Sequence, residues 1–234
     1  MLYLINEFLK GGVFTSLART RIYIASVDAL RDSAAFERLY ASVSAERQAK
    51  IDRLSSEKEK RLSLAAELLL IRALRDIGIS RLELEYGDRG KPYIKGDPVF
   101  FNISHSNERV ICAISPYEVG CDVELIAECD PEKARRFFAP REYDYISSLK
   151  DAKKMRDEFF RLWTLKESFI KATGDGLSLP LKSFELELDQ VSVKPLNHLG
   201  KTYFFKEYSL DDGYKYAVCA LSDEFDEPIT VRLN

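Results

Sequence analysis

The sequence predicts a mixed α/β (α+β) fold made of two similar halves that pack face to face. Each half reads as a strand, a helix, a longer helix and then further strands, and this shared order is the main evidence. The two long predicted helices also share residues at an offset of 100 positions. These identities are Arg61 with Arg161, Leu62 with Leu162, and Glu67 with Glu167. The hydrophobic content of 46% is enough for the core that such a fold needs.

The predicted first half covers residues 21–115 and follows an N-terminal extension of residues 1–20. Its first strand is expected at 21–27. Ser44 is the expected N-cap of a helix over 44–54, and apolar residues at helical spacing predict a longer helix over 56–77 that ends at Gly78. Further strands are expected at 82–86, 91–94, 100–105 and 110–114, with a tight turn at 87–90.

The predicted second half covers residues 116–234. It opens with a strand over 119–126, which is followed by helices over 131–149 and 154–172. Strands are then expected near 183–189, 202–208 and 214–221. Because interfaces between such halves are preferred ligand sites, a functional cleft is expected between them.

Composition excludes several classes of protein. The chain has 234 residues and a net charge of −3, which argues against general nucleic-acid binding. No apolar run reaches the roughly 18–20 residues that a membrane-spanning helix needs, and the N-terminus does not read as a signal peptide. The 4 cysteines lack a metal-type spacing, and the 2 histidines exclude a His-rich metal site. A cytoplasmic protein with buried free thiols, bound neither to membrane nor to nucleic acid, is expected.

Acidic residues and a lysine suggest a magnesium-dependent reaction at phosphate. Asp122 and Glu124 share one face of the strand 119–126 because side chains alternate along a strand. Glu167 and Lys171 lie one turn apart on the helix 154–172. If the strand and helix pack together, three carboxylates and an ammonium meet, which suits Mg²⁺ and phosphoryl transfer. The alternative is an exposed strand face and an ordinary helical ion pair.

Two further groups of residues are candidates for binding anions. Ser104 and His105 follow an apolar strand, where a hydroxyl, an imidazole and backbone N–H groups could hold a phosphate. The alternatives are a self-capped turn or a serine hydrolase, although the G-x-S-x-G elbow of many hydrolases is missing. The basic candidates, each of which also reads as a solvated surface charge, are Arg47, Lys50, Arg61 and Lys91.

Four segments together resemble the 4′-phosphopantetheinyl transferases of the surfactin-synthetase type. They are Gly90-Lys91-Pro92, Phe101-Asn102-Ile103-Ser104-His105-Ser106, Gly120-Cys121-Asp122-Val123-Glu124, and the run from Trp163 to Lys171 with its continuation Gly176-Leu177-Ser178-Leu179-Pro180. Their order and spacing make the resemblance specific, and it covers nearly all of the chain after residue 20.

The resemblance implies the 4′-phosphopantetheinyl transferase fold, a pseudo-dimer with its site between the halves. It also implies transfer of phosphopantetheine from coenzyme A to a serine of an apo acyl or peptidyl carrier protein, with release of adenosine 3′,5′-bisphosphate. Asp122, Glu124 and Glu167 would hold Mg²⁺, and Glu167 would also help to deprotonate the serine. Lys171 would stabilise the phosphate under attack.

The remaining expectations concern the donor and the carrier. By resemblance, Lys91 would reach the pyrophosphate or adenine of coenzyme A. Ser104 and His105 would bind the 3′-phosphate together with Arg47, Lys50 and Arg61. The enzyme is expected to act as a monomer, and residues 133–141 are the expected docking surface for the carrier. A coenzyme A-binding module without catalysis is the second hypothesis. Carriers of fatty-acid, polyketide, peptide and lysine biosynthesis all remain possible.

Overall fold

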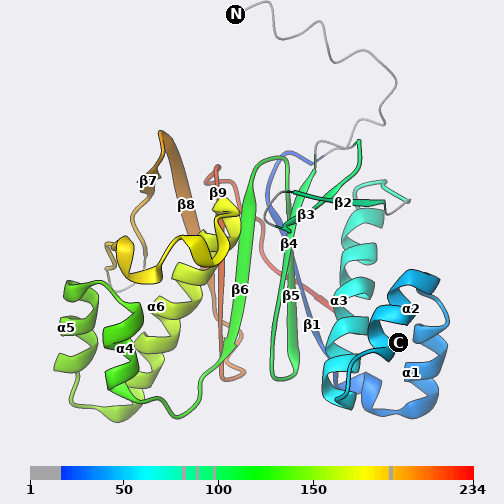
Figure 1. Cartoon of the computed structure of the whole chain (residues 1–234), viewed down its shortest axis with the longest axis horizontal. Coiled ribbons are helices and arrows are strands. Elements are labelled where there is room, and N and C mark those ends of the chain that lie inside the picture. Colours follow the sequence, from blue (N-terminus) through cyan, green and yellow to red (C-terminus); the bar gives the residue numbers. More distant parts are fainter. Residues whose placement is uncertain (1–16, 81–82, 88–89, 97–98, 190–191) are drawn as a thin grey trace, which may run out of the picture.

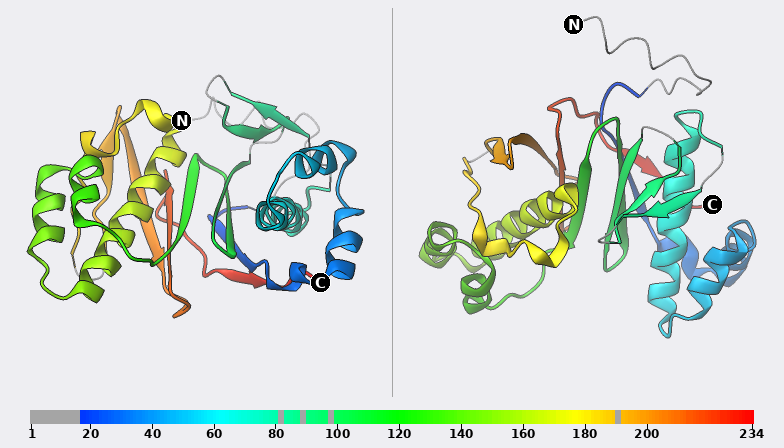
Figure 2. Two further views of the ribbon diagram at one scale, coloured as in Figure 1. Left: turned by 60° about the horizontal axis from the view of Figure 1, so that its bottom comes forward. Right: turned by 45° about the horizontal axis from the view of Figure 1, so that its top comes forward.

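The computed structural model describes residues 17–80, 83–87, 90–96, 99–189 and 192–234. The chain forms four layers, in which two sheets face each other and helices cover the outer face of each sheet (Figure 1). The two further views in Figure 2 show the same order, with the first half on one side and the second half on the other. The expected arrangement of two α/β halves packed face to face is confirmed.

The first half is built around a four-stranded sheet of order β10-β1-β5-β4. Its strands are β1 (Arg21–Ser26), β4 (Phe100–Ser106), β5 (Arg109–Ser115) and β10 (Ile229–Val231). Its helices are the 3₁₀ turn η1 (Asp28–Arg31), α1 (Ser33–Tyr40), α2 (Ala45–Asp52) and α3 (Glu57–Arg75). A separate hairpin of β2 (Leu84–Tyr86) and β3 (Pro92–Ile94) lies beside them.

The second half is built around an antiparallel sheet of order β6-β9-β8-β7. Its strands are β6 (Val119–Leu125), β7 (Leu196–His198), β8 (Lys201–Tyr208) and β9 (Tyr214–Ala220). Its helices are α4 (Pro131–Phe137), α5 (Pro140–Ser148), α6 (Ala152–Thr173) and the short 3₁₀ turns η2 (Gly176–Ser178) and η3 (Leu181–Ser183).

Both faces of β1 are buried, which explains why its sequence is a continuous apolar run. Ile22 and Ile24 pack against the sheet of the second half, whereas Tyr23 and Ala25 face the helices of the first half. β6 contributes Cys121 and Val123 to the layer between the sheets. The opposite face of β6 is therefore the one that turns toward α6.

Local signals set the ends of two helices that carry candidate residues. The Ser44 hydroxyl accepts a hydrogen bond from the Arg47 N–H and caps α2, as the sequence predicts. α6 ends at Gly174, which adopts a left-handed conformation with φ of 73°. A residue with a Cβ disfavours this conformation, so Gly174 fixes where α6 stops.

Several predicted elements differ from the structure. The helix expected over 131–149 is two helices, because Phe138 and Ala139 are extended and Pro140 starts α5. The strand expected at 183–189 is wrong, since this region holds η3 and one isolated bridge at Leu188. The sequence also did not reveal α1, β7 or β10, whose apolar patterns are short.

The chain ends bear on the predicted division into halves. Residues 1–16 of the predicted extension lie outside the described residues, whereas Leu17 is buried in the core of the first half. Residues 229–231, assigned by sequence to the second half, pair in parallel with β1 of the first half. The boundary at residues 115 and 116 otherwise falls between β5 and β6 and stays a prediction. No helix in the described part of the chain could span a membrane.

Candidate functional site

The site begins where α6 crosses β6 at very short range. A Cβ built on Gly120 would lie 2.1 Å from the Ser168 carbonyl oxygen and 2.2 Å from the Ala172 nitrogen. Only a glycine therefore allows this contact between the backbones of strand and helix. Asp122 and Glu124 follow on the same face of β6, so the close crossing brings them to the side chains of α6.

Asp122 is the centre of a buried hydrogen-bonded cluster. Its Oδ1 lies 2.5 Å from the Lys171 Nζ and accepts a 2.7 Å hydrogen bond from the Ser104 hydroxyl. The Lys171 ammonium also donates to the Ser104 oxygen at 2.9 Å. Asp122 is only 2% exposed. The cluster thus joins β4 of the first half to β6 and α6 of the second half.

Glu124, Glu167 and His105 surround this cluster on its open side. Glu124 accepts a 2.8 Å hydrogen bond from the Ser106 hydroxyl, and Ser106 also accepts from the Leu125 N–H. A cavity of about 340 Å³ is lined by all three residues. The cavity is also lined by Ile103, Ser104, Asp122, Trp163 and Lys171. The structure therefore brings together every acidic candidate, Lys171, Ser104 and His105.

Burial and neighbouring charges shift the pKa values of the site residues. Burial raises the pKa of Asp122, although Lys171 and Ser104 oppose this shift. Burial also raises the pKa of Glu124 and Glu167, and the charge of Asp122 raises both further. Burial disfavours the charged form of Lys171, but attraction to Asp122 outweighs it and raises the pKa of Lys171. Desolvation and the Lys171 charge lower the pKa of His105.

These carboxylates suit a hard cation that is completed by substrate oxygens. Asp122 Oδ2 is buried and has no hydrogen-bond partner among the described residues, so it can still accept a cation. No group of three His, Cys, Asp or Glu within the described ranges is arranged to hold a metal alone. Mg²⁺ is commonly bound by one or two carboxylates together with phosphate oxygens. The donor chemistry fits Mg²⁺, whose binding here stays a prediction.

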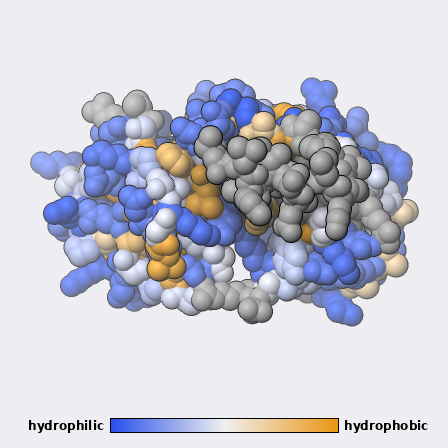
Figure 3. Space-filling view, turned by 90° about the horizontal axis from the view of Figure 1, so that it is seen from above, coloured by the Kyte–Doolittle hydropathy of each residue, from blue (hydrophilic) through white to orange (hydrophobic). Residues whose placement is uncertain are grey.

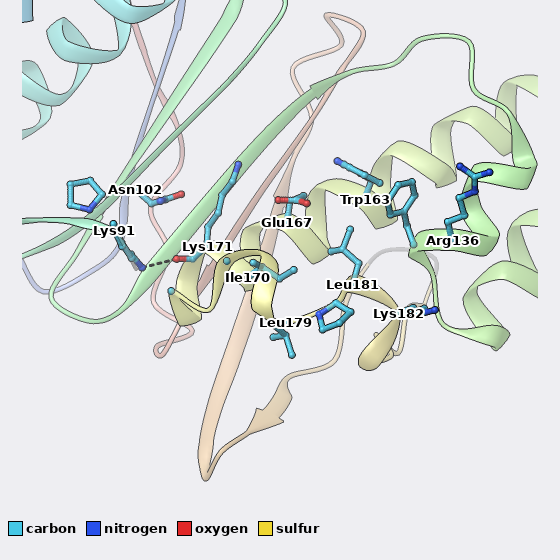
Figure 4. Close-up of a pocket in the computed structure, with 16 residues that line it drawn as sticks. Lys91, Asn102, Arg136, Trp163, Glu167, Ile170, Lys171, Leu179, Leu181 and Lys182 are labelled. Atoms are coloured by element: carbon cyan, nitrogen blue, oxygen red, sulfur yellow. Dashed lines mark hydrogen bonds between the residues drawn. The ribbon is translucent and has the colours of Figure 1, made fainter. Parts of the chain in front are cut away.

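A second, apolar cavity adjoins the polar cavity along α6. It measures about 660 Å³ and is lined by Phe137, Ile170, Leu179, Pro180 and Leu181. Trp163, Glu167 and Lys171, spaced four residues apart on α6, line both cavities. Figure 4 shows these three side chains along α6, with Leu179 and Leu181 on the loop that follows it. Glu167 and Lys171 therefore lie between the polar cavity and the apolar cavity.

The basic candidates do not all reach the cluster. Arg47 pairs with Glu67 at 2.6 Å, and Lys50 contacts Glu46 and the Tyr86 hydroxyl. Arg47 and Lys50 line a small pocket of about 80 Å³ beside α2, whereas Arg61 lines another of about 410 Å³. Neither pocket includes Ser104 or His105. A shared 3′-phosphate site therefore stays a prediction for these three residues.

Lys91 lies between the halves and is already engaged by backbone groups. Its ammonium donates to the carbonyl oxygens of Val119, Lys171 and Ala172 at 3.0, 2.6 and 3.0 Å. Burial lowers the pKa of Lys91 to about 8. The side chain also lines the apolar cavity, but the expected contact with coenzyme A stays a prediction.

Sequence reasoning missed residues that support the site. The Asn102 side chain accepts a hydrogen bond from the Cys121 N–H and ties β4 to β6. The Lys166 ammonium is 0% exposed and contacts both oxygens of Glu142 and the Phe184 carbonyl. The alternation Asn102-Ser104-Ser106 was a readable signal for the β4 face. No local pattern links Lys166 to Glu142.

Comparison with known proteins decides the family. The sequence model of the 4′-phosphopantetheinyl transferase superfamily matches residues 118–219. A 4′-phosphopantetheinyl transferase of Bacillus subtilis is 34% identical over 220 residues, which cover 91% of this chain and 97% of the relative. The chain belongs to the 4′-phosphopantetheinyl transferase superfamily. The transferase Sfp of B. subtilis strain 168 is 37% identical over 203 residues, which cover 83% of this chain and 89% of Sfp.

Another relative extends this likeness beyond B. subtilis. The 4′-phosphopantetheinyl transferase gsp of Aneurinibacillus migulanus is 37% identical over 81% of each chain. The region that matches the superfamily runs from the start of β6 to the end of β9. It therefore contains Asp122, Glu124, Glu167 and Lys171, and the expectation of an Sfp-like transferase enzyme is confirmed.

Proposed function

We propose that this transferase moves the 4′-phosphopantetheine group of coenzyme A onto a serine of an apo acyl or peptidyl carrier protein. The observation that carries the proposal is that the polar and apolar cavities share one lining, formed by Trp163, Glu167 and Lys171. The polar cavity suits the phosphate groups of coenzyme A, and the apolar cavity suits its pantetheine arm. The phosphorus to be attacked would then lie beside Lys171.

The proposed reaction is an in-line displacement at the phosphorus that bears pantetheine. The carrier serine oxygen forms a bond to this phosphorus while the bond to the leaving phosphate of adenosine 3′,5′-bisphosphate breaks. Glu167 accepts the serine proton, directly or through water, and its raised pKa suits a general base. The Lys171 ammonium offsets the negative charge that develops on the attacked phosphate.

Asp122, Glu124 and Glu167 would hold Mg²⁺, which supplies charge neutralisation to the pyrophosphate when it is bound. Ser104 and Lys171 favour the ionised form of Asp122 and orient it, since both contact its Oδ1 and leave Oδ2 available. His105, beside this cluster, would contact the 3′-phosphate, together with Ser104 and the basic residues of the first half.

The partners and the setting follow from the same arrangement. We infer that a monomer is sufficient, because β4 of one half and β6 and α6 of the other supply the site within one chain. Cys112, Cys121 and Cys219 are buried free thiols, which is consistent with a reducing cytoplasm. No contact with membrane or nucleic acid is needed for the proposed reaction.

The two rival functions make different predictions. A serine hydrolase would need His105 to activate Ser104, but the Ser104 hydroxyl donates to Asp122 and accepts from Lys171. A fluorophosphonate probe should therefore leave Ser104 unlabelled. A coenzyme A-binding module without catalysis would bind the donor but modify no carrier.

The deciding experiment is incubation with coenzyme A, Mg²⁺ and a panel of apo carrier proteins from fatty-acid, polyketide, peptide and lysine biosynthesis. Intact-mass measurement should show one phosphopantetheine added to at least one carrier, and no addition to the variant of that carrier with Ala at the modified serine. Coenzyme A binding without any modified carrier across the panel would overturn the proposal in favour of the binding module.

A further inference from the structure

Lys91 occupies an unusual position for a residue expected to bind a substrate. It precedes β3 in the hairpin of the first half, yet its ammonium lies at the C-terminal end of α6 in the second half. Figure 4 shows Lys91 reaching toward the backbone of Lys171, where the dashed line marks their hydrogen bond. The two residues are 80 positions apart in the sequence.

The ammonium has no N–H group left for another partner. A lysine ammonium carries three donors, and those of Lys91 go to the carbonyl oxygens of Val119, Lys171 and Ala172. Two of these oxygens belong to the last turn of α6, where helical carbonyls lack partners within the helix. A positive charge at this end is also favourable to the helix dipole.

The third oxygen makes this contact a clamp between two elements. Val119 is the first residue of β6, the strand that carries Asp122 and Glu124. One ammonium thus ties the start of β6 to the end of α6, beside the close crossing at Gly120. Lys171 takes part twice, because its carbonyl accepts from Lys91 while its own ammonium contacts Asp122.

We propose that Lys91 is a positioning residue: it fixes the end of α6 against β6 and thereby sets where the Lys171 ammonium lies beside Asp122. Lys91 then acts on the reaction through Lys171 and not through a contact with coenzyme A. The apolar cavity depends on the same clamp, because Gly174 and the loop to Leu181 leave α6 directly after it. The Lys91 Cδ also lies 3.5 Å from the place of a Cβ on Gly174.

The first test compares Lys91→Met with Lys95→Met. Methionine keeps an apolar stem but removes all three donors, whereas the Lys95 ammonium, just after β3 of the same hairpin, makes an exposed pair with Glu85. Because a small misplacement of a catalytic group is costly, kcat of Lys91→Met should fall roughly 10- to 100-fold. The dissociation constant and KM for coenzyme A should stay within about twofold, and Lys95→Met should match the wild type.

Either of two results would overturn the proposal. A tenfold or greater weakening of coenzyme A binding at nearly unchanged kcat would show that Lys91 contacts the donor. A lower melting temperature with normal kcat would show a purely structural role. Lys91→Arg supplies N–H donors on a stem of similar length, so it should recover part of the lost kcat.

A second measurement does not depend on turnover. Hydrogen exchange of the peptide that contains residues 166–176 should accelerate in Lys91→Met and stay normal in Lys95→Met. The kinetic test rests on the proposed transfer reaction, but this exchange test does not. A wild type that modifies no carrier would refute the proposed function alone, whereas unchanged exchange at the end of α6 would refute the clamp.

A double-mutant cycle that combines Lys91→Met with Lys171→Ala tests whether Lys91 acts through Lys171. In single-turnover measurements by intact mass, Lys91→Met should add less than about twofold to the defect of Lys171→Ala. Independent, multiplying defects would show that Lys91 has another target. If Lys171→Ala modifies too little carrier to measure, coenzyme A affinity and hydrogen exchange decide between the two roles of Lys91.

Discussion

Asp122 and Glu124 occupy the same face of β6 but experience different surroundings. Asp122 is held by Ser104 and Lys171 and is 2% exposed. Glu124 is partly exposed and accepts its hydrogen bond from Ser106. Replacing Asp122 therefore disturbs a buried charge pair, whereas replacing Glu124 mainly removes an oxygen donor from the polar cavity. The two residues give different tests of the metal assignment.

Glu124→Gln should lower turnover by orders of magnitude and leave the melting temperature close to that of the wild type. Asp122→Asn should lower turnover as well, but it should also cost roughly 1–3 kcal/mol of unfolding free energy, because Lys171 loses its charged partner. Transfer rates across a Mg²⁺ titration and denaturant unfolding measure the two effects. Near-normal turnover of both variants at limiting Mg²⁺ would contradict the metal site.

His105 provides a test of how the donor is oriented. It lines the polar cavity with Asp122 and Lys171, and it is assigned to the 3′-phosphate. His105→Ala should weaken coenzyme A more than 3′-dephospho-coenzyme A, because only the former offers that phosphate. A hydrogen bond to a charged group contributes about 1.5–3 kcal/mol, or roughly tenfold or more in affinity. Equal losses for both donors, measured by calorimetry, would assign His105 another role.

At the scale of elements, the contact between β6 and α6 decides the geometry of the site. The strand carries Asp122, the helix carries Lys171, and Gly120 allows them to approach. Gly120→Ala places a methyl group against backbone atoms that cannot rotate away. The helix must then move outward, so the contact between Lys171 and Asp122 should lengthen.

Gly120→Ala should therefore reduce both unfolding free energy and kcat. Overpacking of this kind typically costs about 1–3 kcal/mol, and misplacement of Lys171 should lower kcat by roughly tenfold or more. Gly200→Ala is the control for stability alone, since a Cβ at Gly200 meets no atom within 4 Å although its φ of 76° disfavours one. A kcat for Gly120→Ala that matches the control would mean that the crossing tolerates displacement.

The buried pair of Lys166 and Glu142 connects α5, α6 and the segment after η3. Glu142 accepts hydrogen bonds from the Lys166 ammonium and from the N–H groups of Ala139 and Leu186. Lys166 also lies over the Phe184 ring, with its Nζ 4.4 Å from the ring centre. Every charge of the pair is compensated, so the loss of one partner is more harmful than the loss of both.

Lys166→Met should lower unfolding free energy by about 3–5 kcal/mol, because it leaves the Glu142 carboxylate buried without a counter-charge. The double variant Lys166→Met with Glu142→Gln should be more stable than Lys166→Met alone. Urea unfolding of the two variants and the wild type measures this difference. Equal stability of single and double variants would show that the pair is not coupled.

At the scale of the whole molecule, the sequence predicted the features that depend on local periodicity. Alternation along β6 placed Asp122 and Glu124 on one face, and helical spacing placed Glu167 with Lys171. The repeated order of elements predicted the two halves. The position of the Lys91 ammonium could not be predicted, because it depends on the packing of the first-half hairpin against α6.

Other failures have equally physical causes. β10 has only 3 residues, too few to show alternation, and it pairs with β1 at the other end of the chain. The split between α4 and α5 was readable from Pro140, which favours the first turn of a helix. The roles of Ser104 and Ser106 required the approach of β4 to β6, which no sequence pattern specifies.

The predicted docking surface for the carrier, residues 133–141, borders the apolar cavity through Arg136 and Phe137. Figure 3 shows hydrophobic residues that reach the surface in small patches amid hydrophilic ones on the side of the second half. Arg136 and Lys182 line the apolar cavity together with Phe137. Arg141, which the sequence grouped with Arg136, lines a different cavity and pairs with Glu185 while 86% exposed. The structure thus separates the two arginines of the predicted docking surface.

Arg136→Glu should raise the KM for the carrier and leave the KM for coenzyme A nearly unchanged. The chain has a net charge of −3, so attraction of an acidic carrier must come from local basic residues and not from overall charge. Arg141→Glu is the matched control, with the same charge change away from the apolar cavity. Rim charges act mainly on the rate of encounter, so the Arg136→Glu defect should shrink as salt screens it.

If both reversals raise the carrier KM equally at low ionic strength, the docking surface extends to α5. If neither does, the carrier approaches another face.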